Sequence, residues 1–99
     1  MSGEVTVRIP TILRTYTGGA AEVTVDPSTT EAGETLSGVL AALEANYAGI
    51  QTRILDDNGA LRRFVNVYVG DEDVRFAEGL ATATPAGTQV SVIPAVAGG

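Results

Sequence analysis

The chain has 99 residues, 44% of them hydrophobic and 18% charged, which is enough for a single hydrophobic core. Twelve acidic and six basic residues give a net charge of −6. The basic residues are all arginine and are scattered along the sequence without forming a basic stripe. An acidic chain of this kind lacks the positively charged surface that binds a phosphate backbone, so we expect no nucleic-acid partner.

Several reactive residue types are missing, since the chain has no His, Cys, Lys or Trp. Disulfides, Cys/His zinc sites, Ser-His couples and Schiff-base lysines are therefore excluded. We expect neither a metal site, nor a catalytic residue, nor an enzyme activity of its own. Residues 1–10 hold no apolar run of the signal-peptide type, and no segment has the roughly 18–20 apolar residues of a membrane span. The sequence predicts a cytoplasmic domain without a membrane partner.

The first third of the chain is typical of an antiparallel hairpin. Apolar and polar residues alternate over 4–9, as in a half-buried strand, and Pro10 ends the pattern. A loop is expected next, with Ile12 and Leu13 as buried plugs. A second short strand is predicted over 23–25.

One helix is predicted after a polar loop over 26–35. Apolar residues recur there with helical spacing, at Leu36, Val39, Leu40 and Leu43, and Tyr47 extends the stripe. Thr35 is a suitable N-cap and Gly49 a suitable C-terminal stop. The stripe could face a partner, but burial in the core is the ordinary role of such a pattern.

The second half of the chain predicts three more strands. Residues 50–61 are irregular, and the acidic turn 56–59 lacks the glutamate that would complete a calcium loop. A strand over 64–69 directs its valines to one face, and a short strand follows over 73–76. The acidic segment 71–73 is expected to be a solvated hairpin tip. The last strand covers 89–93 and ends at Pro94.

This order of elements predicts an α+β fold of the β-grasp (ubiquitin-like) type. One helix packs on one face of a small mixed sheet, and the other face stays partly open to water. We expect residues 1–94 to form the domain and 95–99 a flexible C-terminal tail. On the open face, Phe64, Tyr68 and Ile93 would form an apolar partner-binding patch, unless the loop over 10–21 or a neighbouring strand covers them.

The end of the sequence offers the one candidate chemical group. Residues 95–99 read Ala-Val-Ala-Gly-Gly, without charge or ring, and five extended residues reach roughly 16 Å. Such a segment can thread a narrow channel and present a terminal carboxylate. The plain alternative is a frayed terminus, where small residues are common.

The segment 93–99, Ile-Pro-Ala-Val-Ala-Gly-Gly, resembles the tail of the ubiquitin-like sulfur carriers of the MoaD/ThiS family. Further stretches are similar to the CysO-type branch of that family, which serves cysteine biosynthesis: 9–14, 43–47, 63–69 and 71–76. Together these stretches span nearly the whole chain in the right order. The polar loop over 26–35 is long for the family, and the lack of lysine is a second departure.

The resemblance implies a protein co-substrate with no permanently bound cofactor. An adenylating enzyme of the MoeB/ThiF type would use ATP and Mg to activate the Gly99 carboxylate, and a sulfur donor would convert it to a thiocarboxylate. Gly98, Ala97 and Val96 would thread through the enzyme's channel. The branch further implies a PLP-dependent cysteine synthase as sulfur acceptor, a metal-dependent peptidase that releases the product, and a monomeric free carrier.

Other functions remain open at this stage. Related carriers deliver sulfur to molybdopterin, thiamin or sulfur-containing natural products. A ubiquitin-like modifier would instead join Gly99 to target lysines. A β-grasp interaction module would use no tail chemistry at all, because fold alone does not determine function.

Overall fold

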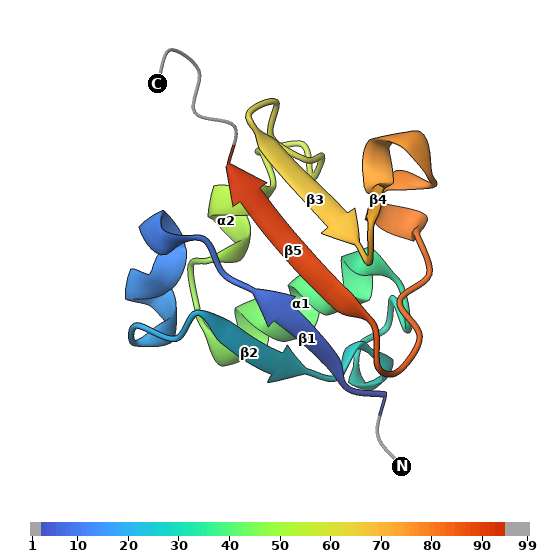
Figure 1. The fold of residues 1–99 in the computed structure, drawn as a ribbon, viewed down its shortest axis with the longest axis horizontal. Helices are drawn as coiled ribbons and strands as arrows, with labels where there is room; N and C mark the ends of the chain where they lie inside the picture. The colour runs from blue at the N-terminus through green and yellow to red at the C-terminus, as the bar shows by residue number, and fades with distance from the viewer. Residues whose placement is uncertain (1–2, 95–99) are drawn as a thin grey trace.

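The computed structural model describes residues 3–94, which form a five-stranded mixed sheet with its helices on one side (Figure 1). The strands lie in the order β2-β1-β5-β3-β4. Their bounds are β1 Val5–Arg8, β2 Glu22–Val25, β3 Val65–Val69, β4 Glu72–Asp73 and β5 Gln89–Pro94. The helices are α1 Leu36–Asn46 and α2 Gln51–Ile54, with short 3-10 helices η1 Thr11–Thr17, η2 Pro27–Thr29, η3 Val74–Phe76 and η4 Gly79–Ala81.

Strand pairing joins the two ends of the chain at the centre of the sheet. β1 pairs antiparallel with β2 and parallel with β5, and β5 pairs antiparallel with β3. The predicted hairpin is confirmed, with Val7 opposite Val23. Because side chains alternate along a strand, this register directs the valines of β1, β2, β3 and β5 to a shared face.

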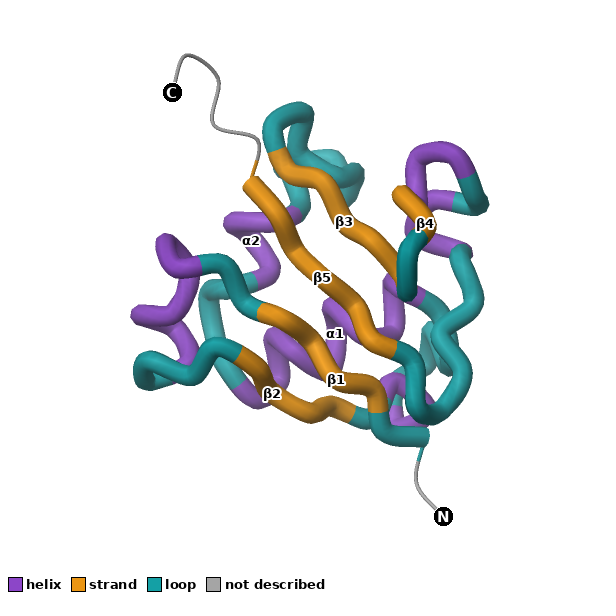
Figure 2. Tube along the Cα trace, in the orientation of Figure 1, coloured by secondary structure: helices purple, strands orange, loops and turns teal. Residues whose placement is uncertain are grey.

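The predicted helix is confirmed and covers that valine face. Thr35 caps α1, its Oγ1 accepting a hydrogen bond from the Gly38 N–H at 3.2 Å. The helix crosses behind the strands in Figure 2, leaving the opposite face of the sheet uncovered by α1 or α2. Its four apolar stripe residues have no exposed surface: Leu36, Val39, Leu40 and Leu43. Gly49 follows the helix with φ +97°, a conformation that favours glycine.

The loop expected after β1 is instead the 3-10 helix η1, and one of its two predicted plugs is wrong. Leu13 is 7% exposed and belongs to the core, whereas Ile12 is 65% exposed. A 3-10 helix turns by a third of a circle per residue, so adjacent side chains cannot both face the core. Ile12 therefore points outward as Leu13 points in.

Two further stretches differ from the predicted elements. The irregular stretch 50–61 contains α2, and the Glu44 carboxylate accepts hydrogen bonds from the N–H groups of Gly49 and Gln51 at 2.8 and 2.9 Å. The strand expected over 73–76 is shorter, since Asp73 Oδ1 accepts from the Arg75 N–H and the chain turns into η3. Both differences come from side chains that bond to the backbone a few residues away.

The acidic turn of 56–59 is closed by its own first residue. Asp56 Oδ1 accepts hydrogen bonds from the N–H groups of Asn58 and Ala60 at 2.8 and 3.1 Å. Across residues 3–94, no three acidic side chains gather as a metal site would require. None of the helices in this part of the chain is long and apolar enough to cross a membrane.

Candidate functional site

The exit of the C-terminal segment lies at one end of the sheet, where three elements meet. β5 ends at Pro94, opposite Val65 at the start of β3. β1 runs parallel to β5 and ends beside it, with Arg8 opposite Ser91, before the chain turns into η1. We call this end of the strands the exit end of the sheet. The candidate residues Val96, Ala97, Gly98 and Gly99 lie outside the described residues.

The three residues of the predicted patch lie on the open face of the sheet. Ile93 is 46% and Phe64 56% exposed, so neither η1 nor a neighbouring strand covers them. Tyr68 is half-buried. Ile93 pairs with Asn66, which places Phe64 and Tyr68 at the two diagonal positions across the strands. The structure therefore brings the three together, and their role in binding a partner stays a prediction.

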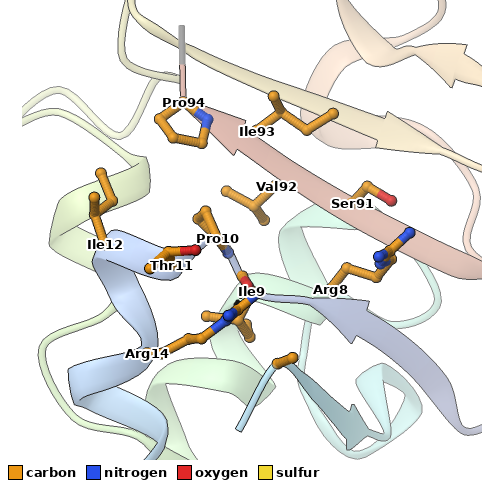
Figure 3. Close-up of a pocket in the computed structure, with 11 residues that line it drawn as sticks. Arg8, Ile9, Pro10, Thr11, Ile12, Arg14, Ser91, Val92, Ile93 and Pro94 are labelled. Carbon is orange, nitrogen blue, oxygen red and sulfur yellow. Dashed lines mark hydrogen bonds between the residues drawn. The ribbon is translucent and has the colours of Figure 1, made fainter. Parts of the chain in front are cut away.

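A cavity of about 470 Å³ opens beside Ile93 and Pro94 (Figure 3). It lies between the end of β1, the start of η1 and the end of β5. Its rim includes the exposed Ile12 and two guanidinium groups, those of Arg8 and Arg14. The sequence does not predict this cavity, because Ile12 is expected to be buried in the core. The available signal was the stretch 9–14, which belongs to the family resemblance but carries no periodicity that would show which side chains face outward.

Arginines gather around the exit end, although they are scattered along the sequence. Arg8 and Arg14 line the cavity from β1 and η1. Arg75 reaches back from η3, and its Nη1 donates to Asn66 Oδ1 at 2.7 Å while its Nη2 donates to the Arg62 carbonyl at 2.8 Å. Three arginines that are scattered along the sequence therefore lie near one another in the fold, because strand pairing brings distant segments together.

Neutral acceptors hold most of these guanidinium groups. Arg14 Nε donates to the Ile9 carbonyl at 3.1 Å. Within residues 3–94 the one ion pair joins Arg8 Nε to Glu22 Oε2 at 3.6 Å, with both side chains more than half exposed. On α2, a hydrogen bond from Arg53 Nε to the Tyr16 hydroxyl raises the pKa of Arg53 above its ordinary value, and the charge interaction with Tyr16 acts in the same direction.

The opposite end of the sheet carries carboxylates. Gly3 N–H donates to Asp26 Oδ2, which places Asp26 beside the start of β1 and near Glu4. A hydrogen bond from the Ser28 hydroxyl is the main cause of a lowered pKa of Asp26. Desolvation acts in the opposite direction, and bonds from the N–H groups of Ser28 and Gly3 lower the pKa further. Asp71 and Glu72 lie at the turn after β3, also away from the exit end.

The family model that matches this chain is that of the ThiS family, over residues 7–99. The chain belongs to the ThiS family. The predicted recognition is thereby confirmed, and the matched range includes the Gly-Gly segment together with the exit end.

Curated relatives and solved structures within this family support the assignment. The sulfur carrier protein CysO of Mycobacterium tuberculosis is 55% identical over 97 residues, which cover 96% of this chain and 98% of the relative. The crystal structure of M. tuberculosis CysO matches with a TM-score of 0.83 and 53% identity, over 93% of this chain and 99% of that one. The β-grasp fold is therefore confirmed.

Two other similar proteins are a carrier solved in a complex and an archaeal modifier protein. A chain of the Amycolatopsis orientalis BexX/CysO complex matches with a TM-score of 0.84 and 45% identity, over 96% of this chain and 99% of that one. The small archaeal modifier protein 3 of Haloferax volcanii is 43% identical over 65 residues, 66% of this chain and 70% of the relative.

Proposed function

We propose that this ThiS-family chain is a sulfur carrier of cysteine biosynthesis and that it carries sulfur as a thiocarboxylate on Gly99. The observation that supports the proposal most strongly is the 55% identity to CysO over nearly the full length of both chains. The missing residue types support it too. A chain without cysteine cannot hold sulfur as a persulfide, so its C-terminal carboxylate is the remaining group that can take sulfur.

The chemistry requires activation, because a carboxylate is a poor electrophile. An adenylating enzyme of the MoeB/ThiF type joins the Gly99 carboxylate to the α-phosphate of ATP, with Mg, and releases pyrophosphate. Hydrosulfide, supplied by a sulfur donor, then attacks the acyl carbon, the C–O bond to AMP breaks, AMP leaves, and the thioacid loses its proton. The product is a thiocarboxylate, a soft nucleophile that attacks where a carboxylate does not.

The body of the domain supplies the binding surface in this proposal. Phe64, Tyr68 and Ile93 form an apolar patch beside the exit end, as interfaces with aromatic centres do. Val96, Ala97 and Gly98 thread through the enzyme's channel, where only small side chains fit. The sulfur acceptor is a PLP-dependent cysteine synthase, a metal-dependent peptidase releases the product, and the carrier acts in the cytoplasm as a monomer when free.

The second candidate is a protein modifier, which the similarity to the small archaeal modifier protein 3 favours. Both candidates need the same adenylated Gly99 and differ in the next step. A modifier forms an isopeptide bond with a lysine of a target, whereas a carrier accumulates as the thiocarboxylate. Delivery of sulfur to molybdopterin, thiamin or a natural product changes only the acceptor.

Intact-mass measurement tests the proposal directly. We expect the chain, incubated with its adenylating enzyme, ATP, Mg and a sulfur source, to gain one oxygen-to-sulfur exchange located at Gly99. Deletion of Gly99, or addition of one residue after it, is expected to abolish loading without changing the circular dichroism spectrum. Normal loading of the truncated chain would refute the assignment of Gly99.

A matched pair of variants tests the narrow channel. Gly98→Val adds a β-branched side chain, so we expect the enzyme to bind the variant but fail to adenylate it. Gly98→Ala adds only a methyl group and is expected to retain more of the adenylation rate. Single-turnover adenylation measured for both variants distinguishes a steric limit from a general intolerance, and equal rates for Gly98→Val and wild type would contradict the channel.

A further inference from the structure

The positive charge of this acidic chain is concentrated at the exit end, on both sides of Ile93. Arg8 and Arg14 line the cavity that Ile93 and Pro94 share. On the other side of Ile93, the Arg75 guanidinium is bonded to Asn66, the residue that pairs with Ile93 across the sheet. Three elements, β1, η1 and η3, therefore each place one arginine among the residues that surround the exit end.

Two of these guanidinium groups, those of Arg14 and Arg75, are oriented without being neutralised. Arg14 and Arg75 donate to backbone carbonyls and to an amide oxygen, none of which carries a charge. The described residues place no carboxylate in ion-pair contact with either of them. Arg8 forms an ion pair with Glu22, and because both side chains are more than half exposed, this pair is open to exchange with a partner's carboxylate. Because hydrogen bonds already hold Arg14 and Arg75, a partner that binds these two side chains loses little conformational entropy.

Because carboxylates gather at the other end, the charge of the domain is distributed unequally along the direction of the strands. Glu4, Asp26, Asp71 and Glu72 lie at or next to the end where β1 and β5 begin, whereas Glu22 lies opposite Arg8 near the exit end. A molecule charged in this way turns its exit end toward a negative surface during diffusional encounter. The net charge of −6 would oppose approach to the same surface in any other orientation.

We infer that the enzyme that adenylates this chain presents carboxylates around the entrance of its channel, and that Arg8, Arg14 and Arg75 pair with them. This inference rests on the proposed function, since it concerns the partner of the same tail. It assigns orientation and encounter to the arginines, and leaves the apolar patch as the centre of the contact.

The spacing of the three groups favours a protein surface over a phosphate group of the nucleotide. Arg8 is on β1 and Asn66, which holds Arg75, is on β3, with β5 between them. Two strand spacings amount to roughly 10 Å, and an exposed isoleucine lies in the gap. Phosphate sites need donors that converge on one anion, whereas charges around an apolar centre are typical of protein interfaces.

Steady-state adenylation with varied carrier concentration tests the inference. The variant with Arg8, Arg14 and Arg75 all changed to Glu should raise the KM for the carrier by about 100-fold, because like charges then face each other. The corresponding Gln variant should raise it by about 10-fold. The kcat and the KM for ATP should not change. A triple Lys variant keeps the charge and loses the planar hydrogen bonds, so recovery to within about 3-fold of wild type would show that charge is responsible.

A matched control separates position from net charge. Arg53→Glu makes the same charge change as Arg75→Glu at a residue of α2, also bonded to a neutral group. We expect Arg75→Glu to raise the KM several-fold more than Arg53→Glu does. The KM of wild type should also rise with salt between about 50 and 500 mM, and that dependence should flatten in the triple Gln variant. Circular dichroism and thermal melting confirm that each variant is folded.

The outcomes distinguish this inference from the function on which it rests. If wild type is adenylated and the triple Glu and triple Gln variants keep its KM, the acidic entrance is refuted and the sulfur-carrier function stands. If the KM for ATP rises in place of the KM for the carrier, the arginines serve the nucleotide and the inference is again refuted. A wild-type chain that is never adenylated refutes the proposed function, and the inference with it.

Discussion

On the covered face of the sheet, Val7, Val67 and Val90 are fully buried beneath α1, whereas Ile93 on the open face is 46% exposed. Both sets of residues belong to the same few strands and obey the same alternation. The covered face is made of similar aliphatic side chains. The open face combines an isoleucine and two aromatic residues with fixed arginines at the exit end. Stability therefore depends on one face, and recognition is expected to depend on the other.

The largest effect is expected from a substitution that creates a cavity beneath the covered face. Leu40 has no exposed surface and lies in the middle of α1. We expect Leu40→Ala to lower the free energy of unfolding by about 3–5 kcal/mol, because it removes buried methyl groups and leaves a void. Urea denaturation measures the loss. Ile93→Ala, as the control on the open face, should cost less than about 1 kcal/mol, and similar losses at both positions would contradict the division between the faces.

A second test concerns the close contact between α1 and the loop over 30–33. A Cβ on Gly38 would overlap the Gly33 carbonyl oxygen, a backbone atom that cannot rotate away. Alanine is the better helix former by about 1 kcal/mol, yet we expect Gly38→Ala to destabilise the protein by about 1–3 kcal/mol because the loop must shift.

Thermal melting of Gly38→Ala against Ser37→Ala measures that effect. The neighbouring Ser37 position gains the same helix former without the close contact, so its variant should melt within a few degrees of wild type. A Gly38→Ala variant more stable than wild type would show that the loop over 30–33 yields easily.

Among these single variants, Ile93→Asp is expected to change stability least and partner binding most. The charge would face the partner's apolar surface, so we expect about a 10-fold or greater loss of affinity for the adenylating enzyme. The free energy of unfolding should change by less than about 1 kcal/mol, because Ile93 is not part of the core. Binding and melting measurements on the same sample check both statements.

Thr24→Asp provides the control for Ile93→Asp. Thr24 is exposed on β2, away from the exit end. Normal affinity for both variants would refute the patch, and a loss for both would show that the whole open face is contacted.

Patterns of local spacing were sufficient for most of the fold. The 3.6-residue period over 36–43 identified α1, and the alternation over 4–9 and 64–69 identified two strands and their buried valines. These predictions were correct because each rests on many residues that repeat the same choice. The sequence did not predict η1 and α2. Both are short, and individual hydrogen bonds such as those accepted by Glu44 stabilise this part of the chain.

The candidate site divides in the same way. Phe64 and Tyr68 share a face by simple alternation, so the sequence predicted where they lie. The cavity at the exit end was beyond that reasoning, because it depends on Ile12 turning outward and on β1 ending beside β5. Arg75 was missed too, since its contacts with Asn66 and Arg62 join residues 9 and 13 positions apart.

The sequence by itself determined the single core, the main helix, the absence of cysteine and histidine chemistry, and the resemblance that led to the family. All of these are properties of composition, of local period or of a contiguous motif. The tertiary structure alone decided that three of the six arginines, Arg8, Arg14 and Arg75, lie around the exit end near Ile93. That grouping depends on parallel pairing of β1 with β5, two strands from opposite ends of the chain. No local pattern encodes such a contact, because its energy comes from burying both strands beneath α1.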